Sequence, residues 1–356
     1  MRFFSRSLDS LRPGALTLLL ALAGALLCVW LSTPLPWMIG PLLVTAAASM
    51  LRVRTESWAL LRNAGQATIG IALGLYFTPA MAALVVSLWW AIGLGIVWAL
   101  LLGLAFGAWL HRLHAQRLPG FNRATSYFAG GIGAASEMTL LAERAQGRTE
   151  LVASAHSLRL LIVTVLIPFA LQFSGMQGLD LSQAQGMREV RVDGLLWLAL
   201  AGSAGAWALH KLDRANPWFL GPLLAAMGLT MAGVELSAMP KELSNAAQLV
   251  IGASLGVRFT PAFVHTAPRW LISVGLGTLA LIVLSAGFAW LLALGTGLPL
   301  ATLLLGTSPG GIAEMAITAK VLQLGAPVVT AFQVCRLIAV LVVQAPLFAL
   351  LYGRRR

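Results

Sequence analysis

Long apolar segments separated by short polar connections dominate the pattern along the chain. In the first half, this pattern predicts helices at 15–33, 36–51, 59–77, 80–110, 125–142 and 151–173. In the second half, it predicts helices at 194–210, 217–233, 243–259, 261–294, 300–319 and 326–351. About 20 apolar residues are enough for a helix to cross a bilayer. The pattern therefore predicts an all-α polytopic membrane protein.

Four sequence blocks occur twice in the same order, which indicates an internal duplication. A Pro-Trp-x-x-Gly-Pro-Leu-Leu block at 36–43 returns at 217–224, and a Phe-Thr-Pro-Ala block at 77–80 returns at 259–262. Between these two lies the third block, a glutamine with two glycines, and the fourth is the glycine-rich stretch described below. We interpret the chain as a first repeat at 1–173, a connecting loop at 174–193 and a second repeat at 194–356.

A glycine-rich stretch closes each half and leads into a glutamate and then an arginine inside an apolar helix. Glu137 and Arg159 follow the first stretch, and Glu314 and Arg336 follow the second, each 177 residues after its counterpart. Glycine lacks a Cβ and so tolerates a break in a helix. Each repeat is therefore predicted to contain a broken or re-entrant glycine-rich segment.

The charges indicate topology rather than nucleic-acid binding. Only 10% of the residues are charged, and the net charge of +12 comes from Lys and Arg clusters between apolar runs. Such clusters mark cytoplasmic loops. With both termini cytoplasmic, about five transmembrane helices per repeat put most clusters inside, with Lys241 and Lys320 as exceptions. With an odd number of membrane crossings per repeat, the second repeat starts on the opposite side of the membrane from the first. The two repeats are then inverted, as in many secondary transporters. We expect a multi-pass inner-membrane protein.

The two glutamates carry the principal functional hypothesis. A carboxylate within a membrane segment is costly, so it is a candidate site for a coupling proton or cation. We therefore predict an ion-coupling role for Glu137 and Glu314. The alternative is that each glutamate forms a structural ion pair with Arg159 or Arg336, which would also be sensitive to mutation. The residues alone leave both interpretations open.

The predicted substrate site surrounds the two breaks, where backbone groups must line a cavity or be buried in protein. It comprises Gly130, Gly131, Gly133, Ser136, Thr307, Ser308, Gly310, Gly311, Arg159, Arg336, Gln66 and Gln248. A guanidinium can form two parallel hydrogen bonds with one carboxylate, so the two arginines could bind an anionic solute. Alternatively, the glycines serve close helix packing, and each glutamine forms a hydrogen bond between helices.

No catalytic or metal-binding set emerges from the sequence. The five histidines have no metal-site spacing. Cys28 and Cys335 lie far apart within apolar segments and suggest neither a disulfide nor a metal site. We therefore expect a protein without a cofactor that is not an enzyme.

The repeated Pro-Trp-x-x-Gly-Pro-Leu-Leu blocks and the glycine-rich blocks ending in Glu-Met resemble the AbrB-type duplicated membrane proteins of bacteria. Members are labelled ammonia monooxygenases or transcriptional regulators. The resemblance covers nearly the whole chain and implies a layout similar to the cation/proton antiporter and bile-acid symporter superfamily, with inverted repeats and crossing broken helices. The two glycine-rich blocks differ at one place: the first half has Ile132-Gly133-Ala134 where the second half has Pro309-Gly310-Gly311.

These observations favour a secondary transporter that moves a small, anionic or zwitterionic solute with proton or cation coupling. The resemblance implies an alternative, a membrane protein that affects gene expression indirectly, since no connection is long enough for a DNA-reading module. A membrane monooxygenase is a further alternative, although no ligand cluster for its cofactor is visible. The expected partners are a solute and the lipid bilayer, without direct nucleic-acid contact. A second copy of the chain, forming a homo-oligomer, is a further partner that the sequence leaves open.

Overall fold

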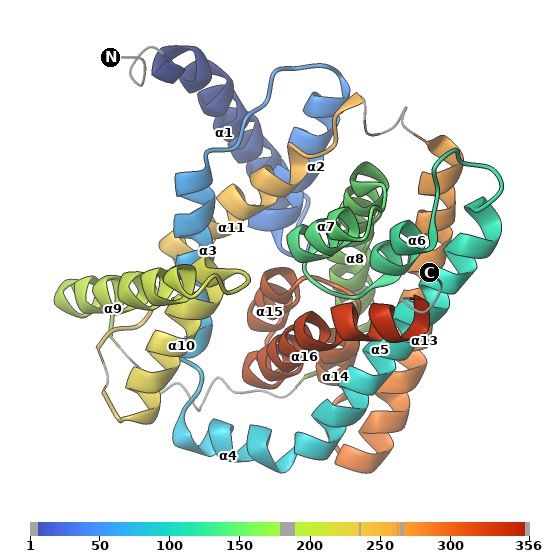
Figure 1. The fold of residues 1–356 in the computed structure, drawn as a ribbon. Coiled ribbons are helices and arrows are strands. Elements are labelled where there is room, and N and C mark those ends of the chain that lie inside the picture. The colour runs from blue at the N-terminus through green and yellow to red at the C-terminus, as the bar shows by residue number, and fades with distance from the viewer. Residues whose placement is uncertain (1–5, 179–188, 235, 262, 264–266, 353–356) are drawn as a thin grey trace.

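The computed structural model describes residues 6–178, 189–234, 236–261, 263 and 267–352 (Figure 1). Within these residues every regular element is a helix, and fifteen helices are present. The all-α class expected from the apolar pattern is therefore confirmed. The expected connecting loop at 174–193 lies partly outside the described residues, and the three arginines at 354–356 lie wholly outside them.

The helices follow the predicted segments closely in both halves of the chain. The first half contains α1 (Arg6–Trp30), α2 (Pro36–Met50), α3 (Ala59–Gly74), α4 (Pro79–Ser87), α5 (Trp89–His114), α6 (Arg123–Gly130), α7 (Ala135–Arg144) and α8 (Thr149–Ser174). The second half contains α9 (Val192–Lys211), α10 (Pro217–Met231), α11 (Lys241–Gly256), α13 (Pro268–Thr296), α14 (Leu300–Thr307), α15 (Ile312–Val321) and α16 (Ala326–Tyr352).

The start of α4 shows how local sequence places a helix boundary. The Thr78 hydroxyl oxygen accepts a hydrogen bond from the backbone N–H of Met81, and Pro79 occupies the first helical position. This pairing satisfies a donor that the helix itself leaves free, and proline fits there because its missing N–H is not needed. The helix predicted to begin at 80 therefore begins one residue earlier, at Pro79. The matching start at Thr260-Pro261 leads into residues that are only partly described.

Fewer helices than expected are long enough to span a membrane. Among the described residues, α1 from Arg12, α5, α8, α9, α13 and α16 have sufficient length and hydropathy, and α3 with α4 would make a seventh span although they are bent by 88°. The sequence predicted about ten. The predicted helix at 80–110 is two helices, and α2 and α10 have only 15 residues each. At about 1.5 Å per residue, such helices fall short of a hydrocarbon core of about 30 Å.

Helices α1, α2, α3, α9, α10 and α11 form one packed group, which we call the crossed-helix group. Its contacts are reciprocal between the two halves of the chain: Gly70 and Gly74 of α3 lie against α10 at Phe219 and Leu223, whereas Gly252 and Gly256 of α11 lie against α2 at Met38 and Leu42. A Cβ at Gly70 would lie 2.5 Å from the Phe219 carbonyl oxygen. The small residues thus allow backbones to approach closely, as helices in membranes often do.

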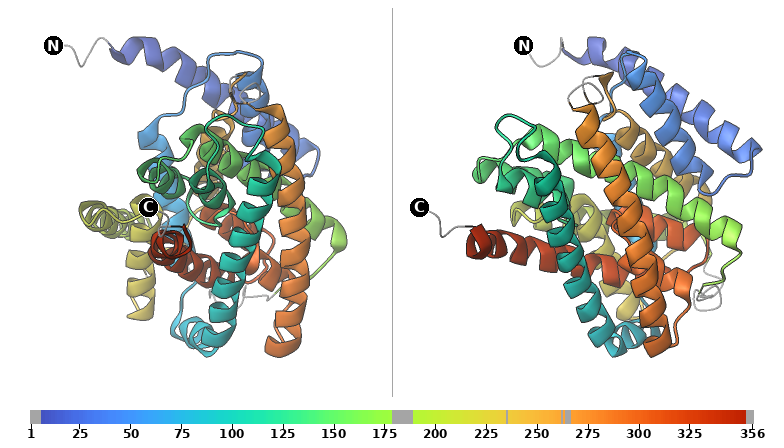
Figure 2. Two further views of the ribbon diagram at one scale, coloured as in Figure 1. Left: turned by 45° about the vertical axis from the view of Figure 1, so that its right-hand side comes forward. Right: turned by 90° about the vertical axis from the view of Figure 1, so that its right-hand side faces the viewer.

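Helices α5 to α8 and α13 to α16 form the second group, which we call the hairpin group. Figure 2 shows the long helices α5 and α13 running alongside each other on one side of the molecule. Trp98 of α5 stacks on Phe288 of α13 with ring centroids 4.7 Å apart. The short helices α6 and α7 pack on α8, and α14 and α15 pack on α16. Each broken segment is therefore held by the long helix that follows it.

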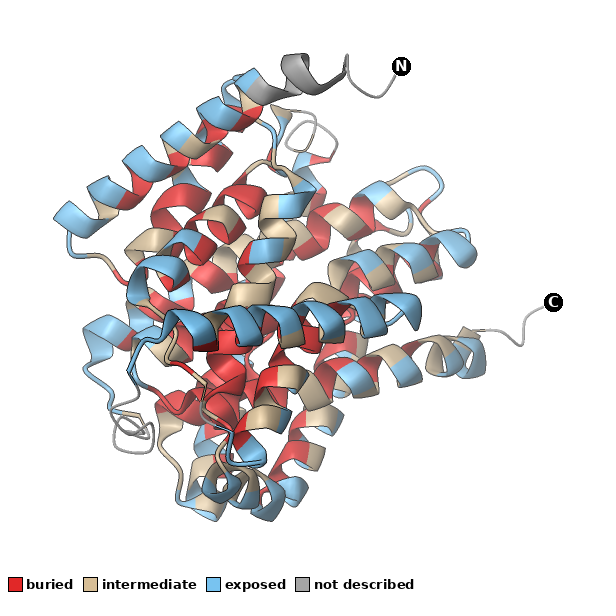
Figure 3. Ribbon diagram, turned by 90° about the vertical axis from the view of Figure 1, so that its left-hand side faces the viewer, coloured by how far each residue is buried: buried red, intermediate tan, exposed pale blue. Residues whose placement is uncertain are grey.

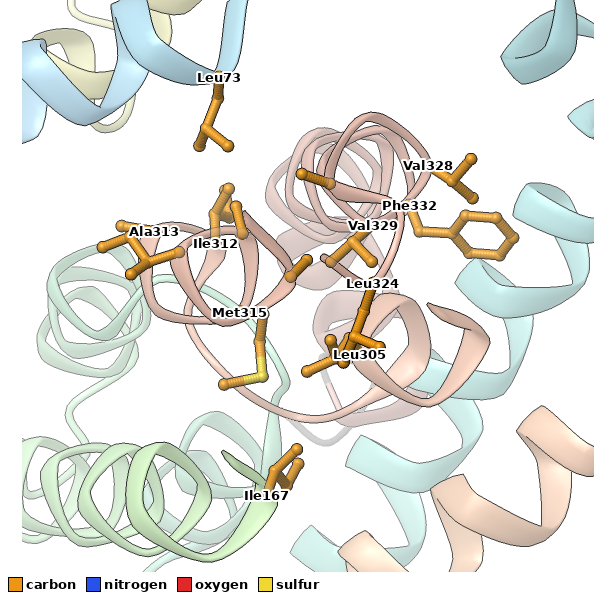
Figure 4. Close-up of a cluster of buried hydrophobic side chains, with 14 of the residues drawn as sticks. Leu73, Ile167, Leu305, Ile312, Ala313, Met315, Leu324, Val328, Val329 and Phe332 are labelled. Carbon is orange, nitrogen blue, oxygen red and sulfur yellow. The ribbon is translucent and has the colours of Figure 1, made fainter. Parts of the chain in front are cut away.

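The most buried part of the molecule lies where the two groups meet. Figure 3 shows buried positions concentrated in the middle and exposed ones on the outer helices. In the close-up of Figure 4, side chains of α14, α15 and α16 fill the space between Leu73 of α3 and Ile167 of α8. Exposed large apolar residues such as Trp197 and Trp207 cover the outside of α9. Such a surface is suited to lipid rather than to water.

Candidate functional site

Both glycine-rich stretches break a helix, as the sequence predicted. Helix α6 ends at Gly130 and α7 begins at Ala135, while α14 ends at Thr307 and α15 begins at Ile312. The four residues between each pair include extended backbone, with φ −55° and ψ 135° at Gly131 and φ −61° and ψ 148° at Ser308. Extended residues leave backbone N–H and C=O groups without helical partners, and buried groups of this kind need other partners.

The first broken segment folds back on itself. The Asn122 side-chain nitrogen, just before α6, donates to the carbonyl oxygen of Gln146, just after α7, at 2.6 Å. The backbone N–H of Arg148 donates to the Thr125 hydroxyl at 2.9 Å. The two ends of the segment therefore lie side by side, so α6 and α7 form a hairpin.

Arg159 of α8 binds the first break through its backbone. Its guanidinium donates to the carbonyl oxygens of Gly131, Ala129 and Gly130 at 2.8, 3.4 and 3.5 Å. The side chain is 2% exposed. A buried guanidinium needs partners for its donors, and the break supplies carbonyls that no helix satisfies. Arg159 therefore stabilises the irregular backbone of the first hairpin.

Arg336 of α16 binds the second break in the same way. Its Nη1 donates to the carbonyl oxygen of Ser308, and its Nη2 donates to that of Gly310 at 2.8 Å. The buried Nε atom makes no hydrogen bond to any described residue. Arg159 and Arg336 also lie close enough to interact electrostatically. The structure thus brings the two arginines, and with them the two breaks, into one region.

Two residues of this network escaped the sequence analysis. His156 Nδ1 accepts from Arg159 at 2.8 Å while His156 Nε2 lies 2.9 Å from the Phe128 carbonyl oxygen, which assigns the proton to Nε2. In the second half, the Gln333 side-chain oxygen accepts from Arg336, and its nitrogen donates to Leu305 at 2.7 Å. Each lies three residues before its arginine and 177 residues from the other, a signal that the sequence does carry.

Glu137 and Glu314 occupy the same place in their helices. Each is the third residue of α7 or α15, in the first turn after the break. A carboxylate is stabilised there by the partial positive charge of the helix N-terminus. Among the described residues, neither glutamate forms an ion pair with an arginine, since Arg159 and Arg336 bind backbone carbonyls instead. The structural ion pair considered from the sequence is therefore absent from this arrangement.

The environments of the two glutamates differ. Glu314 is buried, with 8% of its surface exposed, whereas Glu137 is half-buried. The Glu314 carboxylate folds over Gly311, where a Cβ would overlap with Oε2. Ala134 stands at the position that matches Gly311. Its methyl group therefore excludes the same fold-back of Glu137.

The charge that interacts with Glu314 belongs to Arg258, which follows α11 in the crossed-helix group. Arg258 lines a small cavity of about 10 Å³ together with Leu42 of α2 and with Ser157 and Leu160 of α8. That volume is enough for about one water molecule. The cavity lies between the two helix groups, and a Cβ at Gly311 would also contact Leu160. Glu314 therefore lies at the boundary between the groups.

The remaining predicted substrate-site residues fall into two sets. Gly130, Gly131, Gly133, Gly310, Ser136, Thr307 and Ser308 all lie in or next to the breaks. The hydroxyls of Thr307 and Ser308 donate to carbonyls of α14, those of Leu303 and Leu305. Gln66 of α3 and Gln248 of α11 lie in the crossed-helix group, and neither side chain hydrogen-bonds to a break within the described part of the chain.

The glycines of the first break serve close packing as well. A Cβ at Gly130 would lie 2.6 Å from the carbonyl oxygen of Gly103 in α5. At Gly133 it would lie 2.9 Å from the Val340 side chain. The packing role that the sequence left open is therefore present at both positions. In the described part of the chain, no three His, Cys, Asp or Glu side chains are grouped closely enough to hold a metal ion.

The chain is similar in sequence to known bacterial proteins over most of its length. A 27% identical relative from Bacillus subtilis, named "Uncharacterized protein YhjN", aligns over 346 residues, 89% of this chain and 87% of the relative. The Escherichia coli protein named "Putative regulator AbrB" is 27% identical over 313 residues, 86% of this chain and 87% of that protein. No solved structure matches the chain. The family described as "Transition state regulatory protein AbrB" matches residues 37–352. The chain is a polytopic membrane protein of the AbrB family.

Proposed function

We propose that this protein is a secondary transporter of the inner membrane that moves a small anionic solute with proton or cation coupling. The observation that carries the proposal is the pair of breaks, each held by a buried arginine and each followed by a glutamate in the first turn of a helix. Broken helices that present their N-termini near the midplane are how many secondary transporters bind anionic groups. Irregular backbone at that depth is tolerated where it lines a cavity or is buried in protein.

Unpaired polar atoms beside the breaks support a solute site there. Arg336 Nε and Gln344 Oε1 are buried and make no hydrogen bond to the described residues. The Gln344 side chain lies next to the first break, since a Cβ at Gly131 would be 3.4 Å from its Nε2. A buried donor without a partner costs about 1–3 kcal/mol. A carboxylate bound between the breaks would satisfy the arginine donor.

The position of Glu314 supports a coupling mechanism for the proposed transport. When ionised, its carboxylate occupies the N-terminal end of α15 and keeps a second anion away by charge repulsion. When it binds a proton, the repulsion is removed and the helix N-terminus becomes available to an anionic solute. Proton and anion would then bind together, which makes the proposed process a symport.

The two helix groups supply the proposed movement. We infer inverted repeats at 1–173 and 194–356 with both termini cytoplasmic, supported by the reciprocal glycine contacts and by the basic clusters. In such transporters one group rocks or slides against the other around a fixed site. Glu314 of the hairpin group and Arg258 of the crossed-helix group interact across the boundary. Movement of one group would therefore change the electrostatic environment of the coupling glutamate.

Uptake into proteoliposomes tests this proposal. Radiolabelled lactate, succinate and glutamate are supplied outside, and an inward proton gradient is imposed. We expect at least one of them to accumulate at least tenfold over protein-free liposomes, and accumulation to fall to background with Arg336→Gln. The matched control is Arg191→Gln, an exposed arginine in a surface ion pair with Asp193. Accumulation that is equal in all variants, or absent for every anion, would contradict the proposal.

The names of the relatives favour a second candidate, an indirect effect on gene expression. A transported solute could change transcription without any contact between this chain and DNA. Deleting the gene and restoring it as Glu314→Gln separates the two functions. Transcript changes that are reversed by the Glu314→Gln protein would support regulation independent of transport, whereas changes reversed only by the unaltered protein would support transport as the cause.

A further inference from the structure

A second cavity lies away from the boundary between the helix groups, at the outer end of the first hairpin. Its volume is about 300 Å³, and it is enclosed by the last turns of α5, the start of α6 and the end of α16. The polar residues that line it are His111, Arg112, Arg123, Ser126, Tyr127 and Tyr352. Figure 2 shows the end of α16 beside α5 and α6. A cavity of this size falls at the lower end of the range of small-ligand sites.

The charge of this pocket is uniformly positive. Arg112 in the last turn of α5 and Arg123 at the first position of α6 both line it, and no carboxylate does. Within the described residues, neither arginine forms an ion pair with an acidic side chain. Two guanidiniums without counter-ions repel each other, and a bound anion would relieve that repulsion. The pocket therefore has the electrostatics of an anion site.

The side chains of the pocket are held in place by contacts within it. The Arg123 guanidinium lies 5.2 Å from the centre of the Tyr352 ring, a cation–π contact. The buried Ser126 hydroxyl lies 3.3 Å from His111 Nδ1. The Tyr127 hydroxyl donates to the Gln344 carbonyl, so its ring forms a fixed wall. Asn122 caps α6 by accepting from the Thr125 backbone N–H. An anion would therefore be bound by side chains rather than by a free helix end.

We propose that this pocket binds the phosphate group of a phosphate ester. Arginine forms bidentate hydrogen bonds with phosphate oxygens, and two arginines match a group with several charged oxygens. The cavity is larger than inorganic phosphate requires, and its tyrosine rings offer an apolar wall for the remainder of an ester. Basic pockets between transmembrane helices on the cytoplasmic side bind lipid headgroups. The ester is thus either an anionic phospholipid headgroup or a soluble phosphorylated molecule.

Binding to the purified full-length protein in detergent tests the proposal. Native mass spectrometry with phosphatidylglycerol measures the lipid arm, with phosphatidylcholine as the zwitterionic comparison. Titration calorimetry with glycerol 3-phosphate measures the soluble arm. We expect binding in one arm, and we expect its affinity to fall at least tenfold in the double variant Arg112→Gln/Arg123→Gln. Arg117→Gln is the matched control, because this arginine is exposed in the same connection and does not line the pocket.

The outcome also identifies the source of the phosphate. Binding of phosphatidylglycerol alone assigns a lipid headgroup, and binding of glycerol 3-phosphate alone assigns a soluble ester. Equal loss with Arg117→Gln, or no pocket-dependent binding in either arm, would overturn the proposal. Arg112→Gln alone is the second variant, since Arg112 is exposed and its replacement leaves the Arg123–Tyr352 contact in place. It should weaken binding at least threefold without changing the melting temperature of the ligand-free protein.

Discussion

His156 and Gln333 make the same two hydrogen bonds in opposite halves of the chain. Each accepts from the arginine three residues later and lies within hydrogen-bond distance of a carbonyl oxygen 28 residues earlier. An imidazole and an amide can both do this, because each offers one acceptor and at least one donor. The shared geometry makes the two side chains functional equivalents despite their different chemistry.

This equivalence predicts that the two residue types can be exchanged at position 156. His156→Gln should change the free energy of unfolding by less than about 1 kcal/mol, because the amide can replace both hydrogen bonds of the imidazole. His156→Leu should cost about 1–3 kcal/mol, because it leaves the Phe128 carbonyl and an Arg159 donor without partners. Thermal unfolding in detergent would measure both variants. Equal destabilisation by Gln and Leu would contradict the equivalence.

The arginines should matter for stability as well as for the proposed transport. Arg159→Met removes a donor set from the carbonyls of the first break, and each orphaned buried group costs about 1–3 kcal/mol. Arg148→Met is a suitable control, because its partly exposed guanidinium pairs with Glu150 and donates to the Pro119 carbonyl at the surface, where ion pairs contribute about 0–1 kcal/mol. A clearly lower melting temperature for Arg159→Met than for the control is expected. Similar melting temperatures for the two variants would show that water can hydrogen-bond to the carbonyl oxygens of the break in place of Arg159.

The breaks, the glutamates and the arginines could be located from the sequence, but the hydrogen bonds that connect them could not. The interval of 177 residues is visible in the sequence, and so is the charge of each side chain. Opposite charges suggested, as one of two interpretations, that each glutamate forms an ion pair with Arg159 or Arg336. The structure instead directs the guanidinium to backbone carbonyls, because extended residues expose acceptors that only the folded chain reveals. Pairing with backbone cannot be inferred from side-chain types.

Among the described residues, fewer helices than the sequence predicted are long enough to span a membrane, for a related reason. Apolar composition predicts burial but does not distinguish a helix facing lipid from one buried in protein. Helices α2, α3, α10 and α11 are apolar but have only 15 or 16 residues each, and their small residues pack against one another. The fold-back of the first hairpin is likewise fixed by tertiary hydrogen bonds at Asn122 and Thr125. Hydropathy carries no information about such contacts.

The glycines of the crossed-helix group provide a prediction about packing. Gly70→Val should destabilise the protein by about 1–3 kcal/mol, because a side chain there would overlap with the Phe219 carbonyl of α10 and force the helices apart. Gly252→Val should have a similar effect through Met38 of α2. Gly228→Val is the matched control, because no atom lies within 4 Å of a Cβ there. A control variant as unstable as the other two would show that valine itself is harmful in these helices.

The difference between Gly311 and Ala134 predicts an asymmetric result. Gly311→Ala should displace the Glu314 carboxylate from its fold-back position, because the added methyl group overlaps with Oε2. We expect proton-driven uptake to fall at least tenfold while the melting temperature changes by only a few degrees. Ala134→Gly, the reverse change at the matching position, should leave uptake within about twofold. Unchanged uptake in Gly311→Ala would show that this carboxylate position is not required.

The central claim is that Glu314 couples a proton to the solute, and one paired measurement tests it most directly. Solute binding and proton-driven uptake are compared in the same proteoliposome preparation for the unaltered protein, Glu314→Gln and Glu137→Gln, using whichever of lactate, succinate or glutamate is accumulated. Glu314→Gln should still bind the solute, because glutamine resembles the protonated acid, but should lose the stimulation by a proton gradient. Full proton-driven uptake by Glu314→Gln would contradict the account.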